Sequence, residues 1–339
     1  MALRLSVLDQ SPIAEGGTGG QALRNSVDLA RHTDALGYSR YWIAEHHGMP
    51  MLASSAPEIL IAEIAAATEH IRVGSGGVML PHYSPYKVAE TFSILGGLHG
   101  DRIDLGIGRA PGSDRETMFA LQRDRRQMSP DDFPEQLTEL LAYVENDFPA
   151  GHPFARLAAL PGAPGRPDVW LLGSSPQSAI WAGQLGLPYS IADFINPGGA
   201  ANAQLYRERF EPSRRRARPE LTVCVSAICA ESEEEAQRLA SSTRMAITLL
   251  RRGQLIAVPS VEKALAFFEQ PGESQAAAGR RVVVGTPETV RAGLEEVAAE
   301  YDAGEVLVVT ITHDHGARKR SYELLAEAFG LERPVPPAS

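Results

Sequence analysis

Segments typical of β-strands alternate with segments typical of α-helices along almost the whole chain. After the first strand-like segment, Leu23, Val27 and Ala30 follow helical spacing, and Gly37 provides a C-terminal stop. Strand-then-helix alternation is the pattern of a parallel sheet whose strands are joined by helices. Eight segments are predicted as strands: Leu3–Leu8, Arg40–Ala44, Ile71–Leu80, Ile103–Ile107, Val169–Leu172, Pro188–Ala192, Leu221–Cys229 and Glu305–Ile311.

Eight such units admit either a closed barrel or an open doubly wound sheet, and periodicity does not separate these two folds. The placement of polar residues favours the barrel, because barrels build their sites from the C-terminal ends of several strands. We therefore expect an α/β protein with a (β/α)8 TIM-barrel fold, as a single domain over residues 1–330 with a C-terminal tail at 331–339. The residues that follow predicted strands are Asp9-Gln10, Glu45-His46-His47, Gly108-Arg109, Gly173-Ser174-Ser175 and Thr312-His313.

Two stretches are longer than a minimal barrel needs, and we interpret them as insertions after strands 4 and 7. The first, about 110–167, carries a helical pattern near 131–146 and then a Gly- and Pro-rich passage, Gly151 to Pro167, that is predicted as loop. The second, about 243–284, has a helix start at Pro259-Ser260. It is the better candidate for a mobile lid, because it is long, late in the chain and polar at its tip.

Composition limits the partners that the chain can have. Its 339 residues are 44% hydrophobic and 22% charged, as in ordinary globular proteins, so the chain can bury a large core. A formal net charge of −10 has the wrong sign for tracking a nucleic-acid backbone or an anionic membrane surface. No stretch of the sequence is apolar for long enough to span a bilayer. We expect neither nucleic acid nor a membrane as a partner.

The candidate metal ligands are poorly spaced for sharing an ion. Cys224 and Cys229 are five positions apart in one strand-like run, so they would face opposite sides of the strand. His46 and His47 are neighbours on a strand and also face opposite ways. We expect neither a disulfide nor a metal site, which fits a reducing cytoplasm.

A turn of small residues, Gly173-Ser174-Ser175, closes one strand-like segment just before Pro176, where a helix is expected to begin. Free backbone N–H groups and the positive end of the helix dipole allow such a turn to bind a phosphate. A serine before a proline is equally typical of ordinary helix capping, so this turn alone leaves both interpretations open. Arg109 favours the anion site, because it lies in a glycine-rich segment after another strand and its guanidinium can neutralise a ligand's charge.

Two further features each have a structural and a functional explanation. His46 at a barrel mouth could act as a general base near neutral pH, but a packed, hydrogen-bonded histidine is the commoner case and is favoured for this residue taken alone. The glycines of Gly74-Ser75-Gly76-Gly77 interrupt a strand. They indicate either a bulge beneath a ligand or relief of crowding in a tapered barrel, and the sequence leaves both open.

Four segments are each weak signals, but their order and spacing together are specific. They run from Trp42 to His47, from Arg72 to Pro81, from Arg102 to Arg109 and from Gly173 to Pro188. On these segments the chain resembles the bacterial-luciferase-like, flavin-dependent monooxygenases, the luciferase-like monooxygenase family. The likeness covers nearly the whole chain, and it implies the eight-stranded barrel that the alternation also predicts.

The resemblance also implies a site for FMN. Arg109 and three serines would hold the phosphate, and Gly76-Gly77 resembles the family's non-prolyl cis peptide beneath the isoalloxazine ring. His46 matches the family's catalytic histidine, which is proposed to act as a base near the reactive carbon of the flavin. The cofactor-binding residues implied in this way are Gly76, Gly77, Arg109, Ala110, Ser174, Ser175 and Ser178.

By the same resemblance, reduced FMN would react with O2 to form a C4a-peroxyflavin, which then oxidises a small organic substrate such as an aldehyde. The sequence contains no nicotinamide-binding fingerprint, so reduced FMN would come from a separate flavin reductase. Residues 243–284 resemble the family's mobile lid, which would exclude water from the reaction. The family usually pairs subunits through helices that flank the second and third strands, and the apolar segment Pro57–Thr68 suits such a homodimer.

Two other functions stay open at this point. Some family members use the deazaflavin F420 in place of FMN, so F420-dependent hydride transfer is the nearest alternative. Some luciferase relatives bind flavin without turnover, although His46, Arg109 and a long lid argue against such a non-catalytic flavin-binding barrel. Gly108 stands where true luciferases carry a reactive cysteine, so nothing in the sequence supports light emission.

Overall fold

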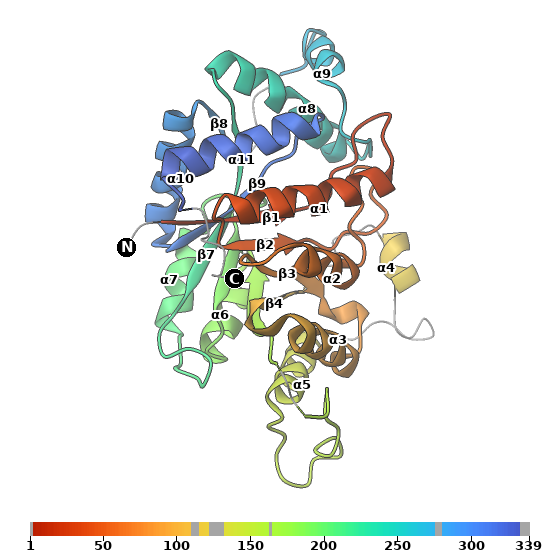
Figure 1. Cartoon of the computed structure of the whole chain (residues 1–339), viewed down its shortest axis with the longest axis vertical. Helices are drawn as coiled ribbons and strands as arrows, with labels where there is room; N and C mark the ends of the chain where they lie inside the picture. Colours follow the sequence, from red (N-terminus) through yellow and green to blue (C-terminus); the bar gives the residue numbers. More distant parts are fainter. Residues whose placement is uncertain (1–2, 110–114, 122–131, 163–164, 275–279, 333–339) are drawn as a thin grey trace, which may run out of the picture.

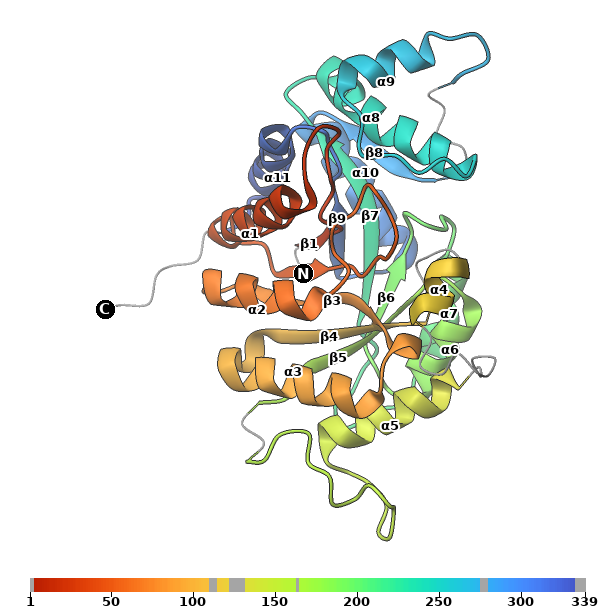
Figure 2. The same ribbon diagram turned by 90° about the vertical axis from the view of Figure 1, so that its right-hand side faces the viewer.

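The protein is built around a closed barrel of parallel strands (Figures 1 and 2). The computed structural model describes residues 3–109, 115–121, 132–162, 165–274 and 280–332. From β1 to β7 each strand pairs with the next one along the chain, and β9 closes the ring by pairing with both β7 and β1. The (β/α)8 TIM-barrel prediction is confirmed. The eight barrel strands within the described residues are β1 (Arg4–Asp9), β2 (Arg40–Ile43), β3 (Arg72–Met79), β4 (Ile103–Gly108), β5 (Asp168–Gly173), β6 (Tyr189–Ala192), β7 (Leu221–Cys229) and β9 (Glu305–Val309).

Helices cover the outside of the barrel (Figure 1). Three of them begin with prolines that mark helix starts in the sequence, at Pro57, Pro85 and Pro176. Gly37, with a φ of 87°, follows the end of the first helix, as its predicted role as a stop requires. The outer helices are α1 (Gly19–Ala35), α2 (Pro57–Ala67), α3 (Pro85–His99), α5 (Phe133–Glu145), α6 (Pro176–Gln184), α7 (Ala200–Glu208), α10 (Pro287–Tyr301) and α11 (His315–Phe329), with short 3-10 turns at η1 (Leu80–His82) and η2 (Gly100–Arg102).

Additional elements follow β4 and β7, where insertions were predicted. After β4 come α4 (Arg115–Leu121) and then α5, which is the helix expected near 131–146. The described part of 151–167 forms turns without helix or strand, as predicted. After β7 come α8 (Glu233–Arg251) and α9 (Val261–Phe268), and Ser260 caps α9 at the expected helix start.

The second insertion also contains a strand that the sequence did not predict, β8 (Val282–Gly285). It pairs with the last part of β7, from Ser226 to Cys229, whereas the first part of β7 pairs with β9. β8 therefore extends the sheet beside β7 and is not one of the barrel strands. A run of four residues without alternating polarity gives little local signal for a strand, and the pairing that makes it one lies more than 50 residues away in the sequence.

The barrel interior is closed by large side chains below its C-terminal mouth. Trp42 and Trp170 are fully buried and meet edge to face, with ring centroids 5.4 Å apart. Cys224 belongs to this inner cluster, while Cys229 packs in the core outside the barrel, so the two thiols face opposite sides of β7 as predicted. Among the described residues, no helix is both long and apolar enough to cross a membrane.

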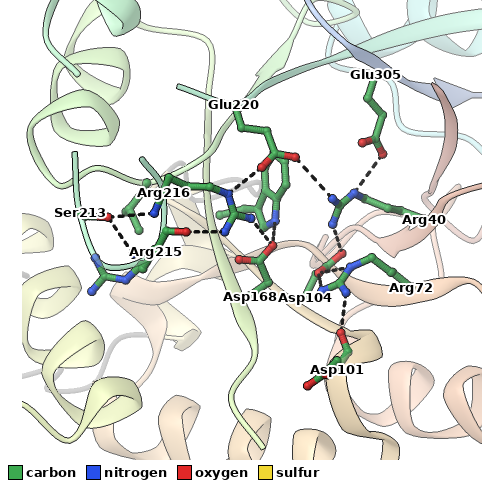
Figure 3. A network of polar contacts seen from close by, with 12 residues as sticks. Arg40, Arg72, Asp101, Asp104, Asp168, Ser213, Arg215, Arg216, Glu220 and Glu305 are labelled. Atoms are coloured by element: carbon green, nitrogen blue, oxygen red, sulfur yellow. Dashed lines mark hydrogen bonds and ion pairs between the residues drawn. The ribbon is translucent and has the colours of Figure 1, made fainter. Parts of the chain in front are cut away.

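The N-terminal end of the barrel is held by a network of buried charges (Figure 3). Asp104 accepts hydrogen bonds from Arg40 at 2.7 Å, from the Trp42 indole at 2.9 Å and from Arg72 at 3.0 Å. Arg40 also pairs with Glu305 at 3.0 Å, so the network joins β2, β3, β4 and β9. Charges buried in this way need all their partners, because losing one partner leaves the other unpaired in a poorly solvated place. Polar residues at this end of the barrel are therefore committed to holding the strands together.

Candidate active site

A cavity of about 460 Å³ opens at the C-terminal ends of the barrel strands. Its walls come from consecutive strands, which places their first polar residues around one rim. In barrel order these are Gln10 after β1, His46 after β2, Gly76 and Gly77 in β3, Arg109 after β4, and Ser174, Ser175 and Ser178 after β5. The cavity thus brings together the candidate site residues of the sequence, except Ala110, which lies outside the described residues.

One side of the cavity, here called the anion corner, consists of Arg109, Ser174, Ser175 and Ser178. Ser175 caps α6, because its hydroxyl accepts a hydrogen bond from the backbone N–H of Ser178 at 3.3 Å. The Ser178 hydroxyl accepts from the Ser175 N–H in return, at 3.4 Å, which completes a capping box. Arg109 comes from the neighbouring strand and lies over the Trp181 ring, 5.6 Å from its centroid. A helix N-terminus and a guanidinium therefore meet at one cavity wall, and this arrangement suits a phosphate.

Gly76 and Gly77, the glycine floor of the cavity, are joined by a cis peptide bond, as the resemblance implied. The register between β3 and β4 shifts here, between Ser75 and Val78, so the strand carries a bulge. Neither position has room for a side chain. A Cβ on Gly77 would lie 2.7 Å from the carbonyl oxygen of Gly106, and a Cβ on Gly76 would collide with Leu8. The strand bulges and its surroundings are crowded, so the crowding explanation is supported, while a ligand above the bulge stays a prediction.

His46 is held by its backbone but not by its ring. Its N–H donates to the carbonyl oxygen of Ser54 at 2.8 Å, while the ring Nδ1 is buried and has no hydrogen-bond partner within the described parts of the chain. Burial, with a smaller contribution from His47, lowers the pKa of His46 to about 4. The imidazole is therefore neutral at pH 7. It is a weaker base than the sequence suggested, and it is not the hydrogen-bonded packing histidine that was favoured for the residue taken alone.

A carboxylate beside His46 ties the end of β2 to the end of β3. Glu45 accepts hydrogen bonds from the His47 ring at 2.8 Å, the Tyr83 hydroxyl at 2.8 Å and the Met79 N–H at 3.0 Å. Glu45 also lines the cavity next to His46, and its bond to the His47 ring lies just beyond the end of β2. The sequence analysis missed this cluster, although the i, i+2 spacing of Glu45 and His47 was a signal for it.

The polar pair after β1 divides into a structural residue and a cavity residue. Asp9 is fully buried and binds Arg318 at 2.6 Å and the Tyr41 hydroxyl at 2.6 Å. Gln10 lines the cavity instead. The sequence analysis noted the pair at a strand end but did not include Gln10 among the site residues. Within the described parts of the chain, no three His, Cys, Asp or Glu residues are placed to share a metal ion.

Comparison with known proteins assigns this chain to a family. Residues 3–303 match the family described as luciferase-like monooxygenase. The chain belongs to this family. It is 42% identical to a luciferase-like monooxygenase of Escherichia coli (strain K12), over 95% of this chain and 96% of that protein. It is 38% identical to the N-acetyl-S-alkylcysteine monooxygenase of Bacillus subtilis (strain 168), over 96% of this chain and 98% of that protein.

Solved structures agree with this luciferase-like fold. The structure of apo-MsnO8 superimposes with a TM-score of 0.91 at 42% identity, covering 98% of this chain and 99% of that one. At lower identity the same fold is found in enzymes that use different cofactors. An oxygenating constituent of 3,6-diketocamphane monooxygenase in complex with FMN matches with a TM-score of 0.73, at 20% identity and over 99% of this chain and 100% of that one. An F420-dependent secondary alcohol dehydrogenase matches with a TM-score of 0.66 at 14% identity. This match covers 97% of this chain and 99% of that one.

Proposed function

We propose that this luciferase-like monooxygenase uses reduced FMN and O2 to oxidise a small organic substrate. The observation that carries the proposal is that the anion corner, the glycine floor and His46 all face one cavity. Membership of the family supports oxygen transfer over other chemistry on the same fold. When bound, reduced FMN supplies the electrons and activates O2 so that one oxygen atom reaches the substrate.

The residues around the cavity fit the parts of FMN. Arg109 and the first N–H groups of α6 would hold the phosphate, because a guanidinium and a helix N-terminus both favour a dianion. The glycine floor presents backbone without side chains, which allows a flat ring to approach closely. The buried Nδ1 of His46 has no partner among the residues that the structure describes, which is unusual for a structural histidine and expected of one that meets a ligand.

His46 would act as the proton acceptor in this site. Since Nδ1 is buried, Nε2 is the ring nitrogen left to face the cavity. A neutral imidazole can accept a proton there as the substrate reacts, and Glu45 would keep the backbone on both sides of His46 in place. A non-catalytic flavin-binding barrel would need no such group.

Cofactor binding separates FMN from F420. The purified protein would be titrated with each cofactor, and retention followed by quenching of cofactor fluorescence. Arg109→Gln should weaken FMN binding at least tenfold, because charge-assisted hydrogen bonds to a phosphate are among the stronger polar contacts. Arg24→Gln removes an exposed arginine on α1 and is the matched control, with no expected change. Retention of F420 but not FMN would favour hydride transfer, and an unchanged FMN affinity in Arg109→Gln would contradict the anion corner.

Turnover tests the reaction itself. Chemically reduced FMN, O2 and a candidate substrate would be mixed with the protein, and ¹⁸O from labelled O2 would be sought in the product by mass spectrometry. The panel contains decanal, because an aldehyde is the expected substrate class, and N-acetyl-S-methylcysteine, because a 38% identical relative is an N-acetyl-S-alkylcysteine monooxygenase. We further propose that reduced FMN comes from a separate cytoplasmic flavin reductase. Rapid oxidation of NADH by the purified chain with FMN alone would contradict that partnership.

A further inference from the structure

Gln10 is a buried amide without a partner. It follows β1, lines the cavity and is only 8% exposed. Its side chain makes no hydrogen bond with any residue that the structure describes. Neither amide atom is completely sealed from solvent, and the residue lines the cavity. A buried amide is ordinarily paired, because removing it from water without a replacement hydrogen bond is unfavourable.

The residues on both sides of Gln10, Asp9 and Ser11, are held in place by several hydrogen bonds. Asp9 is fixed by Arg318 and Tyr41, and it also accepts the Ser11 N–H at 2.7 Å. Ser11 takes a φ of 49°, a left-handed conformation that is unfavourable for a serine, and its hydroxyl lies 2.8 Å from that of Ser26. Non-glycine residues held in this region cluster at functional sites. The anchors present Gln10 to the cavity in one fixed place.

The order of the barrel strands shows which part of the cavity Gln10 faces. The anion corner follows β4 and β5, the glycine floor is in β3, and His46 follows β2. Gln10 follows β1, beyond His46 on the side away from the anion corner. Leu8 and Ala44 line the cavity beside Gln10, and among the polar lining residues Gln10 is an amide with no side-chain partner among the described residues.

We propose that Gln10 is a specificity-determining residue that binds an amide group of the substrate. Its Nε2 would donate to the amide carbonyl of the substrate, and its Oε1 would accept from the amide N–H. An amide satisfies both atoms at once, whereas a carboxylate only accepts and an ammonium only donates. This inference rests on the proposed function, because it assumes that the cofactor occupies the anion corner and the glycine floor.

The test compares two thioethers that differ in the amide. N-acetyl-S-methylcysteine and 3-(methylthio)propanoate, which keeps the thioether and the carboxylate but lacks the amide, would each be titrated by calorimetry into FMN-loaded wild type, Gln10→Leu and Gln10→Asn. Wild type should bind the amide-bearing probe at least tenfold more tightly, and Gln10→Leu should lose most of that preference without a change in FMN affinity. Gln10→Asn keeps the amide on a side chain that is one carbon shorter, so this variant should lose part of the preference for the amide-bearing probe. Gln204→Leu removes an exposed glutamine on α7 and controls for the substitution itself.

Three results would overturn the inference. Wild type could bind both thioethers equally, or Gln10→Leu could weaken both by the same factor. Alternatively, Gln10→Leu could weaken FMN itself tenfold while the preference between the thioethers stays, which would assign Gln10 to the amide-like edge of the flavin ring. Because these are binding measurements, they stand apart from turnover. A protein that shows the amide preference but oxidises neither thioether would contradict the proposed reaction and leave the role of Gln10 intact.

Discussion

Buried polar residues in this protein divide into those that are fully paired and those that are not. At the N-terminal end of the barrel, Arg40 and Asp104 satisfy each other and their neighbours. At the C-terminal end, Asp9 is paired in the same way, but Gln10 beside it and the Nδ1 of His46 have no partner among the described residues. Burial without a partner is costly, and because Gln10 and His46 also line the cavity, we expect these two to meet a ligand.

The first prediction concerns the pH dependence of His46. Burial lowers its pKa to about 4 from an ordinary value of 6.5, so oxygenation by the wild type should stay level from pH 8 to about pH 5 and fall below that as the ring gains a proton. His46→Gln should slow oxygenation by about 10²- to 10⁴-fold at every pH. Its rate should not fall further below about pH 5, because glutamine does not take up a proton in this range. Rates measured at saturating substrate across this range, corrected for FMN binding, check it. A fall centred near pH 6.5 in the wild type would contradict the lowered pKa.

The same pKa shift affects stability, with a definite sign. Between pH 6.5 and pH 4 the unfolded chain binds a proton at His46 that the folded chain does not bind. Acidification through this window should therefore lower the free energy of unfolding of the wild type more steeply than that of His46→Gln. Urea titrations at several pH values measure the difference. If the free energy of unfolding changed with pH by the same slope in both proteins, His46 would not be desolvated in solution.

At the scale of single elements, α6 combines a helix cap with the anion corner. Ser175→Ala removes the capping hydroxyl, which should lower the free energy of unfolding by about 1 kcal/mol and also weaken FMN binding. Ser232→Ala is a matched control, because Ser232 caps α8 through the same kind of bond to the Glu235 N–H and does not line the cavity. Denaturant unfolding and FMN titration of both variants measure the two effects. Equal FMN affinities in the two variants would show that Ser175 serves the helix alone.

How well an element was predicted from the sequence depends on where its partners lie. The start of α6 was predictable, because a serine and a proline determine a cap locally. β8 was not, since only its pairing with the distant end of β7 makes Val282–Gly285 a strand. The Glu45 cluster was missed for the same reason, because two of its three hydrogen bonds come from Tyr83 and Met79 near the end of β3. The convergence of the candidate residues followed from the barrel topology, which alternation and the placement of polar residues after the strands together predicted.

At the scale of the whole molecule, the two ends of the barrel have different tasks. The N-terminal end carries the charge network of Figure 3, and the C-terminal end carries the cavity. This division is typical of barrels, where one face provides stability and the other provides chemistry. Substitution of a paired residue such as Asp104 therefore tests the fold, whereas substitution around the cavity tests function. The outer surface of the helices takes part in neither the charge network nor the cavity.

On that outer surface α2 and α3 lie side by side (Figures 1 and 2), and their exposed apolar side chains are here called the apolar patch. Ile59 on α2 is 71% exposed and Leu98 on α3 is 70% exposed. Large apolar side chains exposed on two neighbouring helices are typical of association surfaces. We therefore propose that two copies of the chain pair through α2 and α3, which the apolar sequence of 57–68 also favoured.

The homodimer gives the last prediction. Light scattering after gel filtration should give twice the chain mass of 36.5 kDa for the wild type. Ile59→Asp with Leu98→Asp should give the mass of one chain, because pairing would bury two carboxylates in an apolar interface without partners. Leu255→Asp places the same charge on a leucine that is 43% exposed between α8 and α9, so this control should stay dimeric. Since the patch lies on helices outside the cavity, the monomeric variant should still bind FMN. A wild type with the mass of one chain, or a doubly substituted protein that stays dimeric, would contradict this surface.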